Sequence, residues 1–332
     1  MKSVIGFLER QMSPVRGILS LALIVSSLLS PGSAFANDPV RLAVSQRGNW
    51  QSAVAELGQK AGIFQKHGLD LDLTFTDGGG QTLQAVLSNS ADIGISIGTE
   101  GVLATYSKGA PIRVVSGGMI GSSDLYWYVP AASPIKSISD AAGKTIAYSA
   151  NGSSTDAVVR GFLSYFKITA TPVATGGMPA TYTQIMSKQI DVGWSLPPFG
   201  LEALDQGKIR LIATGNDLPY LRSQSVRISI ASLKFVQEKP EVLKRFLDAY
   251  RESIDWMYGS DESIKFYAAI TSVPEAVAKR ARDEFYPKAA LDPAKISGLD
   301  SIMAGAVNSK FITAPLSDAQ IKELFVGVAV IR

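Results

Sequence analysis

The stretch from Ala61 to Ser96 constrains the fold more than any other part of the chain. Leu69 to Phe75 alternates apolar and polar residues, the period-2 pattern of a β-strand. Asp77 to Gly80 then interrupts the chain, because consecutive glycines reach backbone angles closed to other residues. Gln81 to Asn89 has helical spacing, and Ala91 to Ile97 is typical of a second strand. The sequence therefore predicts a βαβ unit.

The glycine turn that opens this helix has two interpretations. A glycine-rich turn before a helix directs backbone N–H groups outward and can hold an anion. The same glycines can also form nothing more than a tight, flexible turn. The sequence leaves both interpretations open.

The first 36 residues have the pattern of a secretory signal peptide. Three basic residues precede an apolar run from Ile18 to Leu29, and the small-residue site Ala34-Phe35-Ala36 follows it. A run of twelve residues is short for a transmembrane helix, which is the alternative interpretation. We expect cleavage after Ala36 and a mature protein in the periplasm.

Charge and composition exclude several classes of partner. Of the 32 basic and 29 acidic residues in this 332-residue chain, three and one lie in the signal segment, which leaves a net charge of +1. This balance provides no basic surface for a nucleic acid. With no cysteine and a single histidine, His67, the chain has neither disulfides nor a usual zinc ligand set. We predict no metal and no cofactor.

The remainder of the chain alternates strands and helices in two units of similar size. Strands are expected at 40–46, 69–75, 91–97 and 112–116 in the first unit, and at 125–129, 144–149, 171–175, 190–196 and 209–214 in the second. This rhythm is typical of an α/β fold with parallel strands. A strand at 225–231 should return to the first unit, and the chain beyond Pro240 should be helical.

Two lobes are therefore expected. The first would comprise residues 37–123 plus 226–332, and the second residues 124–225. Two crossing segments would join them and allow the lobes to hinge over a cleft.

Several short motifs also occur in a characteristic order. They are Ala61-Gly62-Ile63-Phe64 with Gly68-Leu69-Asp70-Leu71, Asp77 to Gln81, Ala91-Asp92-Ile93-Gly94, Lys108 to Val115, Ile138-Ser139-Asp140 with Gly143 to Ala147, and Gln189 to Gly193. With these motifs the chain resembles the periplasmic solute-binding proteins of ABC importers, in the branch for sulfonates, taurine, nitrate and the thiamine pyrimidine. The resemblance implies a two-lobed, type II-like α/β fold with a small-molecule ligand in the cleft. It also implies delivery to a membrane permease and its ATPase subunit, by a protein expected to be a monomer.

Ligand-binding residues are expected in turns at the carboxyl ends of strands, where open α/β sheets present ligands to helix N-termini. In the first lobe these residues are Gln46, Arg47, Asn49, Trp50, Gly79, Gly80, Gln81, Ser96, Gly98 and Thr99. In the second lobe they are Ser149, Asn151, Ser153, Ser154, Thr155, Gly177 and Trp194. The hydroxyl groups of residues 153–155 could equally serve as helix caps alone.

Four of the side chains near these turns suggest the chemistry of the ligand. The guanidinium of Arg47 suits two-point binding of a sulfonate or carboxylate. Trp50 and Trp194 are either core residues or an aromatic wall of the cleft. Asp77 is either solvated or faces an ammonium group on a zwitterionic ligand. We predict a small organic anion, such as taurine or an alkanesulfonate, with nitrate, an aromatic acid or a pyrimidine as alternatives.

One motif supports a different class of function. Gly94-Ile95-Ser96-Ile97-Gly98 matches the G-x-S-x-G pattern of serine hydrolases. In that fold the histidine follows the serine, whereas His67 precedes Ser96, so Ser96 lacks an activating base. We therefore expect no catalytic residues and no enzyme, and keep a secreted serine hydrolase as the alternative.

Overall fold

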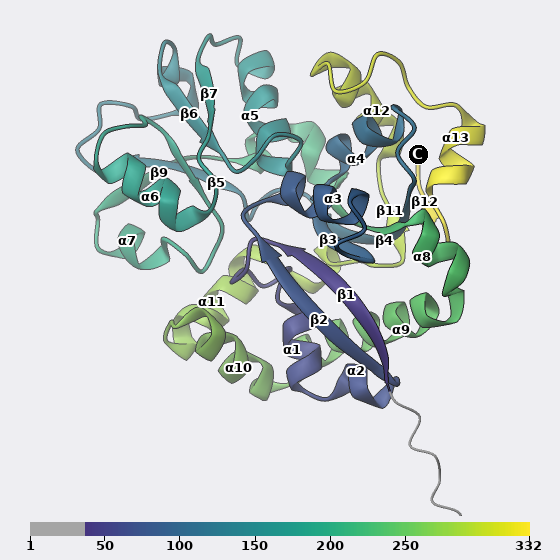
Figure 1. The fold of residues 1–332 in the computed structure, drawn as a ribbon. Coiled ribbons are helices and arrows are strands. Elements are labelled where there is room, and N and C mark those ends of the chain that lie inside the picture. The colour runs from purple at the N-terminus through teal and green to yellow at the C-terminus, as the bar shows by residue number, and fades with distance from the viewer. Residues whose placement is uncertain (1–36) are drawn as a thin grey trace, which may run out of the picture. The chain divides into compact units, whose positions relative to one another are not determined.

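Two β-sheets organise the part of the chain that the structure describes, residues 37–332 of a computed structural model (Figure 1). The first sheet has the strand order β2-β1-β3-β10-β4. Its strands are β1 (Asp38–Ser45), β2 (Leu69–Thr76), β3 (Ile93–Gly98), β4 (Ile112–Ile120) and β10 (Ser225–Ser232). β1 runs parallel to β2 and β3, and β10 runs antiparallel to β3 and β4.

The βαβ unit predicted around the glycine turn is present. β2 leads into α3 (Gly79–Leu87), and α3 returns the chain to β3. The two strands of the unit are not neighbours, however, because β1 lies between them and pairs with both. The unit therefore spans three strands of the sheet.

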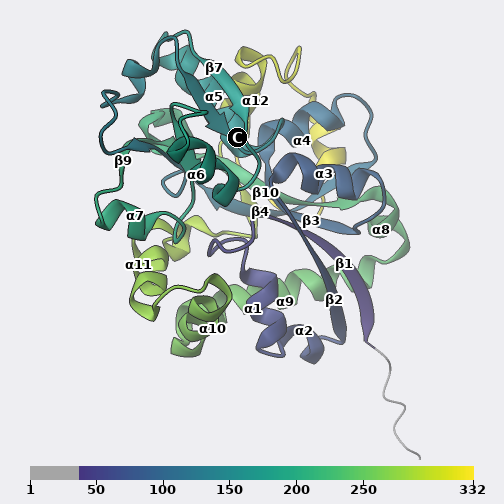
Figure 2. The same cartoon turned by 60° about the vertical axis from the view of Figure 1, so that its left-hand side comes forward.

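Both faces of the first sheet are buried along its central strands, as is usual for parallel strands, whereas Asp70, Asp72 and Thr74 are exposed on the edge strand β2. On β1, Val40, Leu42 and Val44 belong to one hydrophobic core and Ala43 to a second. The helices α1 (Val54–Lys60), α2 (Ile63–Lys66) and α9 (Pro240–Gly259) supply the first core. The helices α3, α4 (Thr99–Tyr106) and α12 (Leu299–Asn308) supply the second (Figure 2).

The second sheet repeats the strand order of the first. β5 (Tyr126–Pro130) lies between β8 (Gly193–Ser195) and β9 (Ile209–Thr214), and β6 (Thr145–Tyr148) pairs with β7 (Thr171–Ala174). A bridge between Ile146 and Val192 joins the two groups. The resulting order, β7-β6-β8-β5-β9, corresponds position by position to β2-β1-β3-β10-β4.

Three helices accompany the second sheet: α5 (Ser154–Tyr165), α6 (Met178–Met186) and α7 (Leu201–Asp205). A short 3-10 helix, η1 (Ile138–Ala141), precedes β6. The helix α7 begins at Leu201, after the Pro197-Pro198 pair. Gly200 has a φ of 86° and a left-handed backbone, so α7 can begin only after it.

Two segments cross between the sheets. The first joins β4 to β5, and the second joins β9 to β10 through η2 (Gly215–Asp217) and η3 (Pro219–Ser223). The strands that follow the crossings, β5 and β10, are antiparallel to their neighbours, so the sheets are mixed and not wholly parallel. Each of these strands enters its sheet from the other lobe and therefore runs in the opposite direction.

The two-lobed α/β fold with two crossing segments is thus confirmed. The described residues, 37–332, belong to one compact unit. The exact lobe boundaries, 37–123 with 226–332 and 124–225, stay a prediction. The predicted signal peptide lies outside the described residues.

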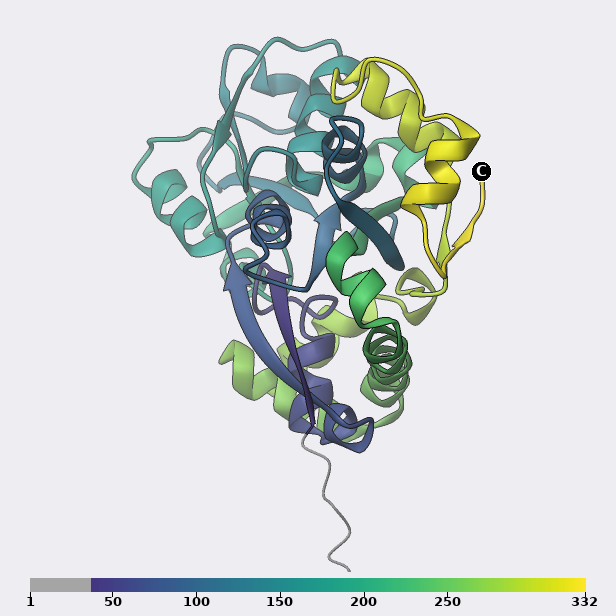
Figure 3. The same cartoon turned by 45° about the vertical axis from the view of Figure 1, so that its right-hand side comes forward.

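The C-terminal third is helical, as expected, and comes forward in Figure 3 in green and yellow. Besides α9 and α12 it contains α8 (Leu233–Glu238), α10 (Asp261–Thr271), α11 (Glu275–Phe285), η4 (Lys288–Ala290) and α13 (Asp318–Leu324). The short strands β11 (Lys295–Ile296) and β12 (Ala329–Val330) pair in parallel. The apolar residues of α12 are buried by contact with α4.

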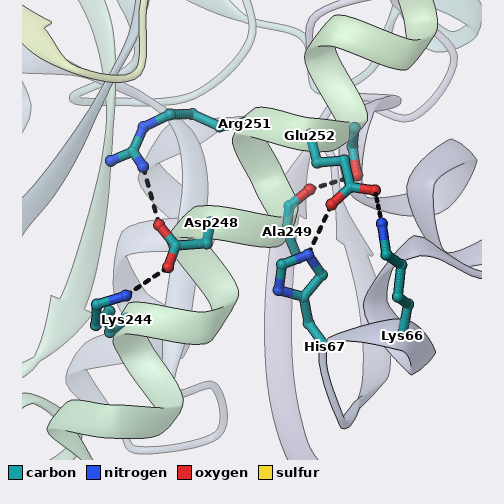
Figure 4. A network of polar contacts seen from close by, with 8 residues as sticks. Lys66, His67, Lys244, Asp248, Ala249, Arg251 and Glu252 are labelled. Carbon is teal, nitrogen blue, oxygen red and sulfur yellow. Dashed lines mark hydrogen bonds and ion pairs between the residues drawn. The ribbon is translucent and has the colours of Figure 1, made fainter.

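His67 lies at the end of α2 and faces α9. Its Nε2 lies 2.8 Å from Glu252 Oε2 on α9, and the neighbouring Lys66 Nζ lies 2.7 Å from Glu252 Oε1 (Figure 4). The carboxylate on α9 therefore anchors the end of α2. Only the packing of α2 against α9 brings these residues together.

Candidate functional site

The turns that carry the predicted site residues approach one another from the two lobes. A Cβ atom added to Gly98, before α4, would lie 2.6 Å from the backbone nitrogen of Ser154. A Cβ atom on Gly78 would lie 2.9 Å from Ser149 Oγ. Only glycine permits contacts this close. These glycines therefore let the two lobes meet where the site was predicted.

The first turn of α3 takes part in the same contact. A Cβ atom on Gly80 would overlap the carbonyl oxygen of Asn151 in the other lobe. A Cβ atom on Gly79 would lie 3.2 Å from the backbone nitrogen of Gly98. Gly79, Gly80, Gly98 and Asn151 are thus brought together, as the sequence suggested.

Three helices begin here at a glycine that has no capping side chain. Gly78, Gly98 and Gly177 precede α3, α4 and α6, and no side chain accepts a hydrogen bond at these three helix starts. The first N–H groups of a helix have no partner within the helix. The helix dipole also favours negative charge at this end. These starts have the chemistry of an anion site.

The hydroxyl groups at the start of α5 are already engaged. Ser153 Oγ accepts a hydrogen bond from the backbone nitrogen of Asp156 at 3.2 Å, which is a helix cap. Thr155 Oγ1 accepts from the backbone nitrogen of Ser149 at 2.9 Å and lies 2.8 Å from Ser153 Oγ. Capping accounts for Ser153, and ligand contact by this group stays a prediction.

Asn49 fixes the turn after β1. Its side chain donates to the carbonyl oxygen of Gln46 at 2.6 Å and accepts from the backbone nitrogen of Ser52 at 2.9 Å. Gln46, at a φ of 56°, donates through Nε2 to the carbonyl oxygen of Asp77. The turn after β1 is therefore tied to the glycine turn after β2.

The polar side chains at the end of β3 are buried and bonded within the first lobe. Ser96 Oγ donates to Gln51 Oε1 at 2.6 Å, and Thr99 Oγ1 donates to the carbonyl oxygen of Ser225. An amide oxygen is not a general base. His67, the histidine that a hydrolase would use as the base, is bonded to Glu252 instead. The surroundings of Ser96 therefore give no support to the hydrolase alternative.

Asp77 lies between the lobes at the start of α6. A Cβ atom on Gly177 would lie 3.3 Å from Asp77 Oδ1. The Asp77 backbone nitrogen donates to Gln81 Oε1 at 3.1 Å, which holds the glycine turn. The Asp77 side chain itself is exposed, so it is placed at the rim of the contact.

Arg47 is paired within its own lobe. Its Nη2 lies 2.5 Å from Glu56 Oε1, and the guanidinium lies 4.7 Å from the centre of the Phe75 ring. The side chain is 54% exposed. The hydrogen bond to Glu56 raises the pKa of Arg47 and offsets its charge. This pairing weakens the case for Arg47 as the anion-binding group.

Both predicted tryptophans are fully buried. The Trp50 ring packs edge-on against Tyr258 and Tyr267 of the C-terminal helices, at 5.7 and 4.9 Å between ring centres. Trp194 Nε1 donates to Thr175 Oγ1 at 3.2 Å. Packing explains both residues without a ligand, and the aromatic wall stays a prediction.

The sequence analysis missed a buried ion pair beside these turns. Arg227 on β10 is 2% exposed, and its Nη2 lies 2.6 Å from both carboxylate oxygens of Asp124 in the first crossing segment. Arg227 Nε is buried and has no partner among the described residues. In the sheet Arg227 stands opposite Gly98. A charged residue inside the apolar strand 225–232 was the available signal, because such residues are rarely buried without a partner.

Tyr286 extends this buried group to the second lobe. Its hydroxyl donates to the carbonyl oxygen of Pro197, after β8, at 3.2 Å. Burial raises the pKa of Tyr286, with a further contribution from the charge of Asp124. The hydroxyl therefore stays neutral and able to donate. Asp124, Arg227 and Tyr286 form a polar group at the junction of the lobes.

Comparison with known proteins identifies the family. The family described as NMT1/THI5 like matches residues 49–263, which is more than half of the chain and contains the turns described above except the start of the turn after β1. The chain belongs to the NMT1/THI5-like family. A Brucella abortus (strain 2308) protein named as a binding protein is 29% identical over 267 residues, which cover 79% of this chain and 80% of that protein.

Solved structures of this NMT1/THI5-like protein's fold include transport proteins. The alkanesulfonate-binding protein SsuA of Xanthomonas axonopodis pv. citri, bound to MOPS, aligns with a TM-score of 0.72 at 18% identity and covers 88% of this chain and 99% of its own. The periplasmic nitrate-binding protein NrtA of Synechocystis PCC 6803 aligns with a TM-score of 0.67 at 12% identity and covers 87% and 86%. At these identities the likeness concerns the fold.

The family predicted from the sequence is therefore confirmed at the level of the NMT1/THI5-like family, and the fold is that of periplasmic binding proteins. Within residues 37–332, no helix is both long enough and apolar enough to cross a membrane.

Proposed function

We propose that this protein captures a small organic anion between its two lobes in the periplasm and delivers it to a membrane permease. The observation that carries the proposal is the convergence of three glycine-capped helix starts, those of α3, α4 and α6. Their free N–H groups suit the oxygens of a sulfonate. Neighbours named for binding alkanesulfonate and nitrate support an anion of this kind. No bond is made or broken.

Arg227 is better placed than Arg47 to supply a positive charge. It is buried next to Gly98, and Asp124 occupies only Nη2 of its five-donor guanidinium. Arg47 points to Glu56 and solvent. A hydrogen bond from a buried guanidinium to an anion is among the stronger polar contacts in proteins. We therefore propose Arg227 as the residue that strengthens anion binding.

Thermal unfolding of residues 37–332 against a ligand panel tests the proposal. The panel contains taurine, alkanesulfonates, nitrate, aromatic acids and pyrimidines. A ligand at about a thousand times its Kd stabilises the folded state by roughly 4 kcal/mol and raises Tm by several degrees. We expect such a shift with sulfonates. A shift with only one of the other classes would assign that class as the ligand in place of a sulfonate. The absence of a shift with every compound would overturn the proposal.

A further inference from the structure

A second pocket lies away from the turns described above, between α5 and α12. Its volume is about 390 Å³, within the range of small-molecule sites. The walls are Tyr165 on α5, Tyr220 on η3, Gln224, and residues 301–309 of α12 and its C-terminal end. Figures 1 and 2 both place α5 and α12 together beside α4.

Two buried polar groups at this pocket have no partner. Gln224, which lines the wall, is 2% exposed, and its Nε2 makes no hydrogen bond within the described residues. Glu100 on α4 lies behind the pocket floor and is 8% exposed. Its Oε2 also has no partner, and a Cβ atom on the floor residue Gly305 would lie 3.3 Å from its Oε1. Buried polar groups are rarely left in this state.

Glu100 forms no ion pair within residues 37–332. Asp156 and Arg160 on α5 are the charged groups that face it, and Arg160 Nε is already paired with Asp156 Oδ1 at 2.8 Å. Tyr220 and Ser309 are its other polar neighbours. Burial raises the pKa of Glu100 to about 7, so its carboxyl group is poised between the neutral and charged forms.

The pocket walls also suit a cation. Tyr165 and Tyr220 are 52% and 39% exposed, although both are large aromatic residues. Aromatic faces attract ammonium groups through the ring quadrupole. No Lys or Arg lines the pocket, so an anion would find no opposite charge there.

We propose that this pocket binds a small organic compound with a primary ammonium group, which the Glu100 carboxylate attracts from behind Gly305 while the apolar part of the compound contacts Tyr165 and Tyr220. Gln224 Nε2 is then available to a hydroxyl or carbonyl acceptor on the same compound. The site is separate from the proposed anion site. Because α5 accompanies the second sheet and α12 packs on α4 of the first, an occupant joins the two lobes.

The test compares n-butylammonium with its neutral analogue n-butanol, by calorimetry and NMR on residues 37–332 without any anion. We expect the ammonium ion to bind and n-butanol to bind at least tenfold more weakly. Binding requires ionised Glu100, so the apparent Kd should be roughly tenfold lower at pH 8 than at pH 6. The assay needs no transport ligand, so its result is independent of the proposed anion.

Variants locate the site. Glu100→Gln keeps the shape of the side chain and should abolish both the binding and its pH dependence, whereas Glu262→Gln, at an exposed residue on α10, should change neither. Thermal unfolding confirms that both variants fold. Equal binding of n-butanol would reveal an ordinary apolar pocket and overturn the proposal. Binding that persists in Glu100→Gln would also overturn the proposal. So would the absence of binding to wild type at a ligand concentration 50-fold above a Kd of ~1 mM, which is a weak affinity for a small ligand.

Discussion

At the scale of single residues, Asp124 and Arg227 couple folding to the site. Both side chains are buried, and within residues 37–332 each forms an ion pair only with the other. Removing one member of such a pair leaves a buried charge unpaired, which costs far more than exchanging both for apolar residues. The pair can therefore be dissected by comparing single and double substitutions.

We expect Arg227→Met to lower the free energy of unfolding by about 3–5 kcal/mol, because Asp124 loses its partner. Adding Asp124→Leu should restore most of that loss. Urea denaturation measures both effects. The stable double variant should then bind the anion found in the panel more weakly than wild type. Unchanged affinity would show that Arg227 does not contact the ligand.

Glu100 makes stability depend on pH. Burial raises its pKa from 4.5 to about 7, so the folded state holds a proton that the unfolded state releases between these values. The stability contributed by the neutral form is complete below pH 4.5 and is lost as the pH rises through about 7. The change is about 3 kcal/mol.

Glu100→Gln should remove this pH dependence, because the amide does not titrate. Urea denaturation of wild type and variant at pH 5 and pH 8 gives the comparison. If the difference between the two pH values is the same for both proteins, another group is responsible.

At the scale of elements, the packing of α1 against α9 depends on one small residue. A Cβ atom on Gly58 would overlap Ser253 Oγ on α9 and lie 2.8 Å from Phe64 Cε2. Alanine normally stabilises a helix interior by about 1 kcal/mol over glycine. Here the overlap must be relieved by separating the two helices, which carry part of the main core.

We therefore expect Gly58→Ala to destabilise the protein by about 1–3 kcal/mol, the usual range for overpacking. Gly259→Ala is the matched control, because a Cβ atom at that end of α9 meets open space. Its effect in urea denaturation should be close to zero. A stabilising effect of Gly58→Ala would mean that α1 and α9 are packed less closely than described.

At the scale of the whole molecule, closure requires backbone contact between the lobes. Gly98 has a φ of −61°, which alanine adopts without strain, but its Cβ atom would lie 2.6 and 2.7 Å from backbone atoms of Ser154 and Ser153. Neither the backbone at Gly98 nor that of Ser153 and Ser154 can move locally to relieve this contact. A methyl group at this position should therefore act as a wedge between the lobes while leaving each lobe intact.

Gly98→Ala should keep its Tm within a few degrees of wild type and lose roughly tenfold or more in affinity for the anion, equivalent to about 1.4 kcal/mol. Small-angle scattering should show that the ligand compacts wild type and Gly259→Ala but not Gly98→Ala. Equal compaction of all three proteins would show that closure does not use this contact.

The sequence by itself determined the elements and the family. Period-2 strands such as 69–75, glycine breaks and the helical stripe beyond Pro240 are local patterns, and they predicted most strands and helices near their observed positions. The turns at 77–80 and 96–99 could be predicted as neighbours, because carboxyl ends of parallel strands meet at one edge of a sheet. The turn at 149–155 follows a strand of the second sheet, and its place opposite them follows from the two-lobed fold.

Only the tertiary structure decided what each side chain does there. Arg47 pairs with Glu56, and Trp50 packs against two C-terminal tyrosines. His67 pairs with Glu252, and Arg227 pairs with Asp124. Three of these four associations join segments more than a hundred residues apart, so no local pattern records them. The insertion of β1 between β2 and β3, and the antiparallel β5 and β10, depend likewise on long-range pairing. Local backbone preference depends on neighbouring residues, whereas charge pairing and burial depend on which distant segments pack together.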